Sequence, residues 1–105
     1  MSREAVEIAK KFKKKIAEKF GDVEIILFGS SAREIMDRES DIDIAVVVGN
    51  DVDLQMRELI YDIAYDIELE NDVVLDVVVY SKKDWEGFKN FHPLIINIER
   101  HGVRV

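Results

Sequence analysis

Residues 23–48 read VEIILFGSSAREIMDRESDIDIAVVV, two apolar runs that a polar stretch separates. The first run, residues 23–28, is rich in β-branched side chains and stops at a glycine and two serines. The second run, residues 41–48, alternates aspartate with isoleucine before it becomes continuously apolar. Both runs have the length and composition of β-strands. We therefore predict two strands, joined through a short helix that a serine begins and that continues to about residue 36.

Helical patterns lie on both sides of this stretch. Apolar residues at three- and four-residue spacing predict a helix over residues 3–20, ended by Gly21. A second long helix is predicted over residues 52–70. Its inward side chains are expected to be Leu54, Leu59, Ile60, Ile63, Ala64 and Ile67.

The C-terminal third continues the alternation of strand and helix. Residues 73–80 predict a third strand, and Ser81 with Asp84 resembles a capping box that opens a helix through Phe88. Pro93 fits the first turn of a last helix that ends at Gly102. The predicted order is α-β-α-β-α-β-α, with helices packed on a small sheet. We expect one α+β domain over residues 1–105.

The composition restricts the class of protein. The chain has no cysteine, no apolar run of about 20 residues and no apolar segment at its N-terminus, so we expect a cytoplasmic protein. Fifteen basic and 22 acidic residues leave a net charge of −7, which disfavours binding to long nucleic acid. The charge is uneven: residues 1–20 hold seven basic and three acidic side chains, whereas residues 51–72 hold one basic and eight acidic.

Three aspartates stand out in the predicted strands. Asp41 and Asp43 share one face because side chains alternate along a strand, and two carboxylates so placed repel each other. Asp76 interrupts a run of valines, where a buried carboxylate needs compensation. If the third strand lies beside the second, the three carboxylates converge. Oxygen ligands of this kind suit Mg²⁺ or Mn²⁺.

Each aspartate also has a simpler interpretation. An isolated Asp-x-Asp pair is typical of a solvated strand edge or turn, and a single Asp in a valine-rich strand can pair with an arginine. The combination of the pair with Asp76 favours a metal site.

Gly29 and Ser30 supply a second element. They follow the first strand and open the predicted short helix, whose N-terminal N–H groups can bind phosphate. Arg33 is a candidate phosphate contact, with a surface ion pair as its alternative. For Gly29 and Asp41 to meet one triphosphate, the end of the first strand must lie beside the start of the second. The two strands are therefore expected to run antiparallel, in a mixed sheet.

The segments Gly29-Ser30-Ser31-Ala32-Arg33 and Ser40-Asp41-Ile42-Asp43-Ile44 together resemble the signature of the DNA polymerase beta-like nucleotidyltransferase superfamily. The length and the ending Ile98-Glu99-Arg100-His101-Gly102-Val103 resemble its smallest members, the minimal nucleotidyltransferases. The resemblance covers nearly the whole chain. It implies the mixed-sheet nucleotidyltransferase fold and transfer of a nucleoside monophosphate from a nucleoside triphosphate.

The resemblance also implies roles for individual residues. Asp41 and Asp43 match the metal-binding pair, and Asp76 matches the third carboxylate, which ligates one metal and helps to activate the acceptor hydroxyl. Gly29 and Ser30 match the turn that grips phosphate. The implied cofactors are two Mg²⁺ ions, with Mn²⁺ as a substitute, and the implied substrate is ATP.

The resembling group suggests a partner. Its members are commonly encoded beside a small helical HEPN protein that acts as a toxin, so we expect an antitoxin that transfers AMP from ATP to a hydroxyl side chain of such a protein. Two alternatives stay open: a binding module that neutralises the toxin without catalysis, and nucleotidyl transfer to a small molecule or an RNA end. Whether the chain forms a homo-oligomer is also open.

Overall fold

The computed structural model describes residues 3–29 and 41–105. In these residues the elements follow the order α1, β1, β2, α2, β3, α3, α4, β4. Their bounds are α1 Arg3–Phe20, β1 Val23–Phe28, β2 Ile42–Val48, α2 Leu54–Asn71, β3 Leu75–Ser81, α3 Lys82–Phe88, α4 Pro93–His101 and β4 Val103–Arg104. The short helix expected after Gly29 lies outside the described residues, as do Ser30 and Arg33.

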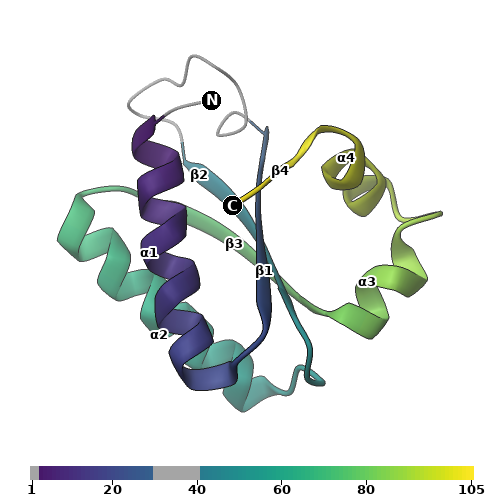
Figure 1. Ribbon diagram of the computed structural model, residues 1–105, viewed down its shortest axis with the longest axis horizontal. Helices are drawn as coiled ribbons and strands as arrows, with labels where there is room; N and C mark the ends of the chain where they lie inside the picture. Colours follow the sequence, from purple (N-terminus) through teal and green to yellow (C-terminus); the bar gives the residue numbers. More distant parts are fainter. Residues whose placement is uncertain (1–2, 30–40) are drawn as a thin grey trace.

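The strands form one mixed sheet in the order β3-β2-β1-β4. β1 runs antiparallel to β2 and to β4, whereas β2 and β3 are parallel. The antiparallel pairing that the sequence predicted for the first two strands is therefore confirmed. Figure 1 shows the three layers, with α1 and α2 on one face of the sheet and α3 and α4 on the other.

Both faces of the sheet are packed. Phe12 of α1 and Ile63 of α2 belong to a core cluster with Ile25 and Ile44 of the sheet. Trp85 of α3 and Ile95 of α4 belong to the second cluster, which packs on the alternate strand positions, such as Ile26 and Ala45. Because β2 is central and covered on both sides, six of its seven residues are buried, which explains its continuous apolar sequence.

Side chains of α2 contact the outer edge of β3. The Leu75 N–H donates to Glu68 Oε2 at 2.9 Å, and Arg57 Nη1 donates to the Val79 carbonyl at 3.3 Å. β3 is an edge strand, and unpaired backbone groups at such an edge invite pairing with another chain. Glu68 and Arg57 satisfy two of these groups and hold α2 against the sheet.

The ends of the helices follow the predicted signals, with one wrong assignment inside α2. Ser81 caps α3, because its hydroxyl accepts from the Asp84 N–H at 3.0 Å, and Pro93 begins α4. Leu54 was expected to point inward, but 71% of it is exposed. It lies nine residues before Ile63, which is half a turn around the helix axis, so only one of the two can face the core.

The short strand β4 was not predicted. Val103 pairs with Leu27, and Gly102 lies so close to β1 that an added Cβ would stand 2.6 Å from Ile26 Cγ2. The Val105 N–H also donates to the Ile25 carbonyl at 3.0 Å. Two residues carry no periodic pattern, so the glycine signalled the end of α4 but not the strand after it. Within the part of the chain that the structure describes, we find no helix with the length and apolar character needed to cross a bilayer.

Candidate active site

Two of the three candidate aspartates lie side by side in the sheet. Asp43 of β2 pairs in register with Asp76 of the parallel strand β3 and with Phe28 of the antiparallel strand β1. Residues paired in this way point to the same face, on strands about 4.8 Å apart. The expectation that the third strand would bring Asp76 beside Asp43 is therefore confirmed at the level of strand register.

We call the paired residues Asp43 and Asp76 the carboxylate row. Gly29, which directly follows β1, lies against Asp43 of this row. Its φ of +59° lies in the left-handed region that side chains disfavour. A Cβ atom at Gly29 would overlap Asp43 Oδ2 and lie 3.2 Å from Asp43 Cγ. The missing side chain therefore provides the space that the Asp43 carboxylate occupies. The sequence marked this glycine as a phosphate-binding turn, and its contact with Asp43 is an additional reason for glycine here.

The three aspartates differ in exposure, which corrects one expectation. Asp43 is half-buried and is the one residue of β2 that is not fully buried. Asp41 and Asp76 are exposed. Asp76 was expected to be a buried carboxylate among valines, but β3 is an edge strand and its Asp76 is open to solvent. The desolvation cost that the sequence suggested for Asp76 therefore does not arise.

The donor chemistry of this row fits a hard divalent cation. Asp43 and Asp76 offer carboxylate oxygens from neighbouring strands, and Asp41 precedes Asp43 by two residues. Across residues 3–29 and 41–105, however, no three acidic or histidine side chains are close enough together to hold one metal ion. The metal-binding role of Asp41, Asp43 and Asp76 stays a prediction.

Hydrogen bonds join α3 and α4, the helices that cover the face of the sheet that Asp43 shares with Ala45. The Trp85 indole N–H donates to Glu99 Oε1 at 2.5 Å, and Arg104 Nη2 donates to the same oxygen at 2.9 Å. The Trp85 hydrogen bond, followed by that of Arg104, lowers the pKa of Glu99 despite the opposing effect of burial. This contact joins α3, α4 and β4. Trp85 is buried, and no local sequence pattern marks Glu99 as its partner.

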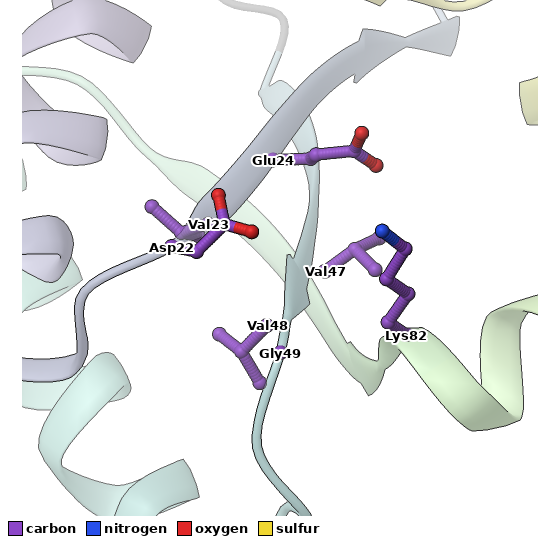
Figure 2. Close-up of a pocket in the computed structure, with 7 residues that line it drawn as sticks. All are labelled: Asp22, Val23, Glu24, Val47, Val48, Gly49 and Lys82. Carbon is purple, nitrogen blue, oxygen red and sulfur yellow. The ribbon is translucent and has the colours of Figure 1, made fainter.

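A small pocket lies at the other end of the sheet (Figure 2). Val23 and Val48, which line it, pair with each other five positions away from the pairing of Phe28 with Asp43. Glu24 and Lys82 extend on the same side of the sheet in Figure 2. The hollow measures about 20 Å³, enough for about one water molecule. It is too small for a nucleotide and is separate from the carboxylate row.

Solved structures share this arrangement of strands and helices. A mutant of the toxin–antitoxin MntA-HpeT aligns with a TM-score of 0.62 at 20% identity, covering 91% of this chain and 70% of that one. A toxin–antitoxin with AMP-PNP gives 0.60 at 21% identity, covering 90% and 70%. A tri-AMPylated Shewanella oneidensis HEPN toxin in complex with MNT antitoxin gives 0.55 at 19% identity, covering 95% and 70%. At these identities the likeness establishes the fold.

Sequence comparison extends the likeness from fold to family. The curated protein named "Putative protein adenylyltransferase MJ0141", from Methanocaldococcus jannaschii, is 35% identical over 104 residues, which cover 97% of this chain and 99% of that protein. Residues 9–105 match the family described as nucleotidyltransferase domain. That match includes β1 and also β2 and β3, which carry Asp43 and Asp76. The chain therefore belongs to the nucleotidyltransferase domain family and is an enzyme of that class.

Proposed function

We propose that this enzyme transfers AMP from ATP to a hydroxyl side chain of a HEPN-type toxin and thereby acts as its antitoxin. The observation that carries the proposal is the row in which Asp43 pairs with Asp76 and Gly29 lies against the Asp43 carboxylate. This row has the acidic groups and the close backbone approach that nucleotidyl transfer needs.

The names of similar proteins support the substrate and the partner. The Methanocaldococcus relative, similar along nearly its whole length, is named as a protein adenylyltransferase. One solved structure of the same fold is a toxin–antitoxin with AMP-PNP, an ATP analogue. Another contains a HEPN toxin that carries AMP groups, in complex with an MNT antitoxin. ATP as the donor and a HEPN-type protein as the acceptor are the choices that agree with all three.

We expect the proposed reaction to require a divalent cation. Asp43 and Asp76 repel each other and would repel a triphosphate, so a nucleotide needs positive charge to bind there. Asp41, Asp43 and Asp76 are the residues that would hold Mg²⁺, two ions in the arrangement that we favour. When bound, Mg²⁺ neutralises the triphosphate and lowers the pKa of the acceptor hydroxyl.

The residues of the chain position the reactants. Gly29 lets the backbone at the end of β1 approach the nucleotide, and Asp43, half-buried beside it, has the more restricted position of the two carboxylates. Asp76 is exposed at the sheet edge, so we assign it to the acceptor side, where its carboxylate takes the hydroxyl proton and passes it to water. The acceptor oxygen bonds to the α-phosphorus, the bond from that phosphorus to its bridging oxygen breaks, and pyrophosphate leaves.

A transfer assay tests this proposal. The purified chain is mixed with ATP labelled on the α-phosphate, Mg²⁺ and a HEPN-type protein encoded beside its gene, and the label on that protein is measured. We expect transfer by the wild type and a loss of at least about 100-fold in Asp43→Asn. Asp51→Asn is the matched control, because Asp51 is an exposed carboxylate outside the row. Absence of labelling by the wild type would overturn the proposal.

A further inference from the structure

The second long helix exposes an apolar stripe that belongs to neither core cluster of the described residues. Leu54, Tyr61, Tyr65 and Leu69 of α2 are 71%, 42%, 58% and 65% exposed. At about 100° per residue, the four side chains lie within about 80° of one another around the helix axis. We call these four residues the α2 stripe.

The α2 stripe lies on the side of the helix away from the core. Ile60, Ile63 and Ile67 are buried, and helical geometry places them about half a turn around the axis from the stripe. A helix that covers a sheet needs one apolar face, and α2 has a second one. Isolated exposed apolar residues are ordinary, but two leucines and two tyrosines aligned along one side of a helix are typical of an interaction surface.

The surroundings of the α2 stripe are acidic. Glu58 lies within the stripe, and Asp62 and Asp66 lie along one side of it. Residues 51–72 hold eight acidic side chains and one basic, a local charge of −7. The basic residue, Arg57, is engaged with the Val79 carbonyl of β3. A complementary surface would therefore be apolar along a narrow row and basic along one side of it.

A second copy of this chain does not supply such a surface. Two α2 stripes packed together would bring their carboxylates face to face, which is repulsive. The basic helix α1 offers lysines, but among the described residues it contributes no exposed large apolar side chain to cover Tyr61 and Tyr65. Lys15 of α1 is also within 3.5 Å of Glu70 in its own chain.

We propose that the α2 stripe is the docking surface for a basic amphipathic helix of a partner protein. Leucines of such a helix would cover Tyr61, Tyr65 and Leu69, and its flanking lysines or arginines would meet Glu58 and Asp62. The C-terminal end of α2 leads into the start of β3, where Asp76 lies, but α2 covers the face of the sheet opposite to the one that Asp43 shares with Ala45. A docked helix would therefore lie on the α1–α2 side of the sheet, behind the carboxylates.

Three synthetic helical peptides of 18 residues, the length of α2, test the proposal on the full chain. The first has a leucine row flanked by lysines, the second has glutamates in place of the lysines, and the third has serines in place of the leucines. We expect the first to bind at least about tenfold more tightly than the other two and to shift the backbone amide resonances of α2. Equal binding of the leucine and serine peptides, shifts confined to another surface, or no binding would overturn the proposal.

Single substitutions locate the site. Tyr65→Ser and Leu69→Ser should each weaken binding of the first peptide at least about tenfold without lowering thermal stability, because both side chains are exposed. Phe91→Ser is the matched control, since Phe91 is 65% exposed but follows α3 on the opposite face of the sheet. Sedimentation of the free chain as a dimer that Tyr65→Ser dissociates would assign the stripe to a second copy and contradict the proposal. The peptides contain no nucleotide, so their binding stands or falls separately from AMP transfer.

Discussion

Gly29 lies directly against the carboxylate of Asp43, at the point where β1 ends beside the start of β2. The contact makes the conformation of the turn and the position of the carboxylate depend on each other. A change in the backbone at Gly29 is therefore expected to act on catalysis through Asp43.

Gly29→Ala tests this dependence. The alanine would have to adopt a φ of +59°, which costs about 1–2 kcal/mol, and its methyl group would displace the Asp43 carboxylate. We expect labelling of the acceptor protein to fall at least about 30-fold. Gly21→Ala is the control, because Gly21 has a φ of +77° but open space around its added Cβ. Equal effects of both alanines on labelling, once matched for stability, would show that the Asp43 contact is unimportant.

The contact between Glu68 and β3 predicts a stability effect. Glu68→Ala removes the acceptor of the Leu75 N–H, and we expect the free energy of unfolding in urea to fall by about 1–2 kcal/mol. Glu70→Ala serves for comparison, since Glu70 forms an exposed ion pair with Lys15, and pairs of that kind contribute about 0–1 kcal/mol. The interpretation fails if the two variants lose the same stability.

The lowered pKa of Glu99 predicts how stability depends on pH. A carboxylate whose pKa is lower in the folded state stabilises the protein above its unfolded pKa, and this contribution is lost as pH falls through the folded value. We therefore expect urea unfolding to show a decrease in stability below about pH 4.5. Glu99→Gln keeps an acceptor for Trp85 and removes the titration, so its stability should fall less over this range. A decrease as steep as in the wild type would exclude Glu99 as its source.

A protection assay separates catalysis from simple binding. If AMP transfer neutralises the toxin, Asp41→Ala/Asp43→Ala should fail to protect cells from the HEPN-type protein while still forming a complex with it. Pull-down of the tagged pair measures the complex, and colony counts measure protection. Full protection by the double variant would favour a binding module whose nucleotide chemistry is not needed.

Local patterns predicted the central part of the fold. Residues 23–28 form β1 as predicted, and β2 begins one residue later than the apolar run suggested. The alternation of Asp41-Ile42-Asp43 predicted which side chains share a face, and the need to bring Gly29 near the aspartates predicted the antiparallel pairing. These features depend on neighbouring residues and on strand geometry, which a sequence displays directly.

Features that depend on the position of an element in the whole molecule were not predictable. The valine run around Asp76 resembles a buried strand, but β3 lies at the sheet edge, so Asp76 is exposed. Leu54 has the residue type of a core position and faces outward. The contact between Trp85 and Glu99 joins residues 14 positions apart on different helices, and no local pattern marks such a pair.

Measurement of AMP transfer by aspartate variants tests the central claim most directly. Asp43→Asn and Asp76→Asn are each incubated with α-labelled ATP, Mg²⁺ and the HEPN-type acceptor, beside the wild type and Asp51→Asn. Because Asp43 and Asp76 lie in one row, both asparagine variants should lose at least about 100-fold in labelling, whereas Asp51→Asn keeps wild-type activity. Wild-type labelling by either Asp43→Asn or Asp76→Asn would contradict the assignment of this carboxylate row as the active site.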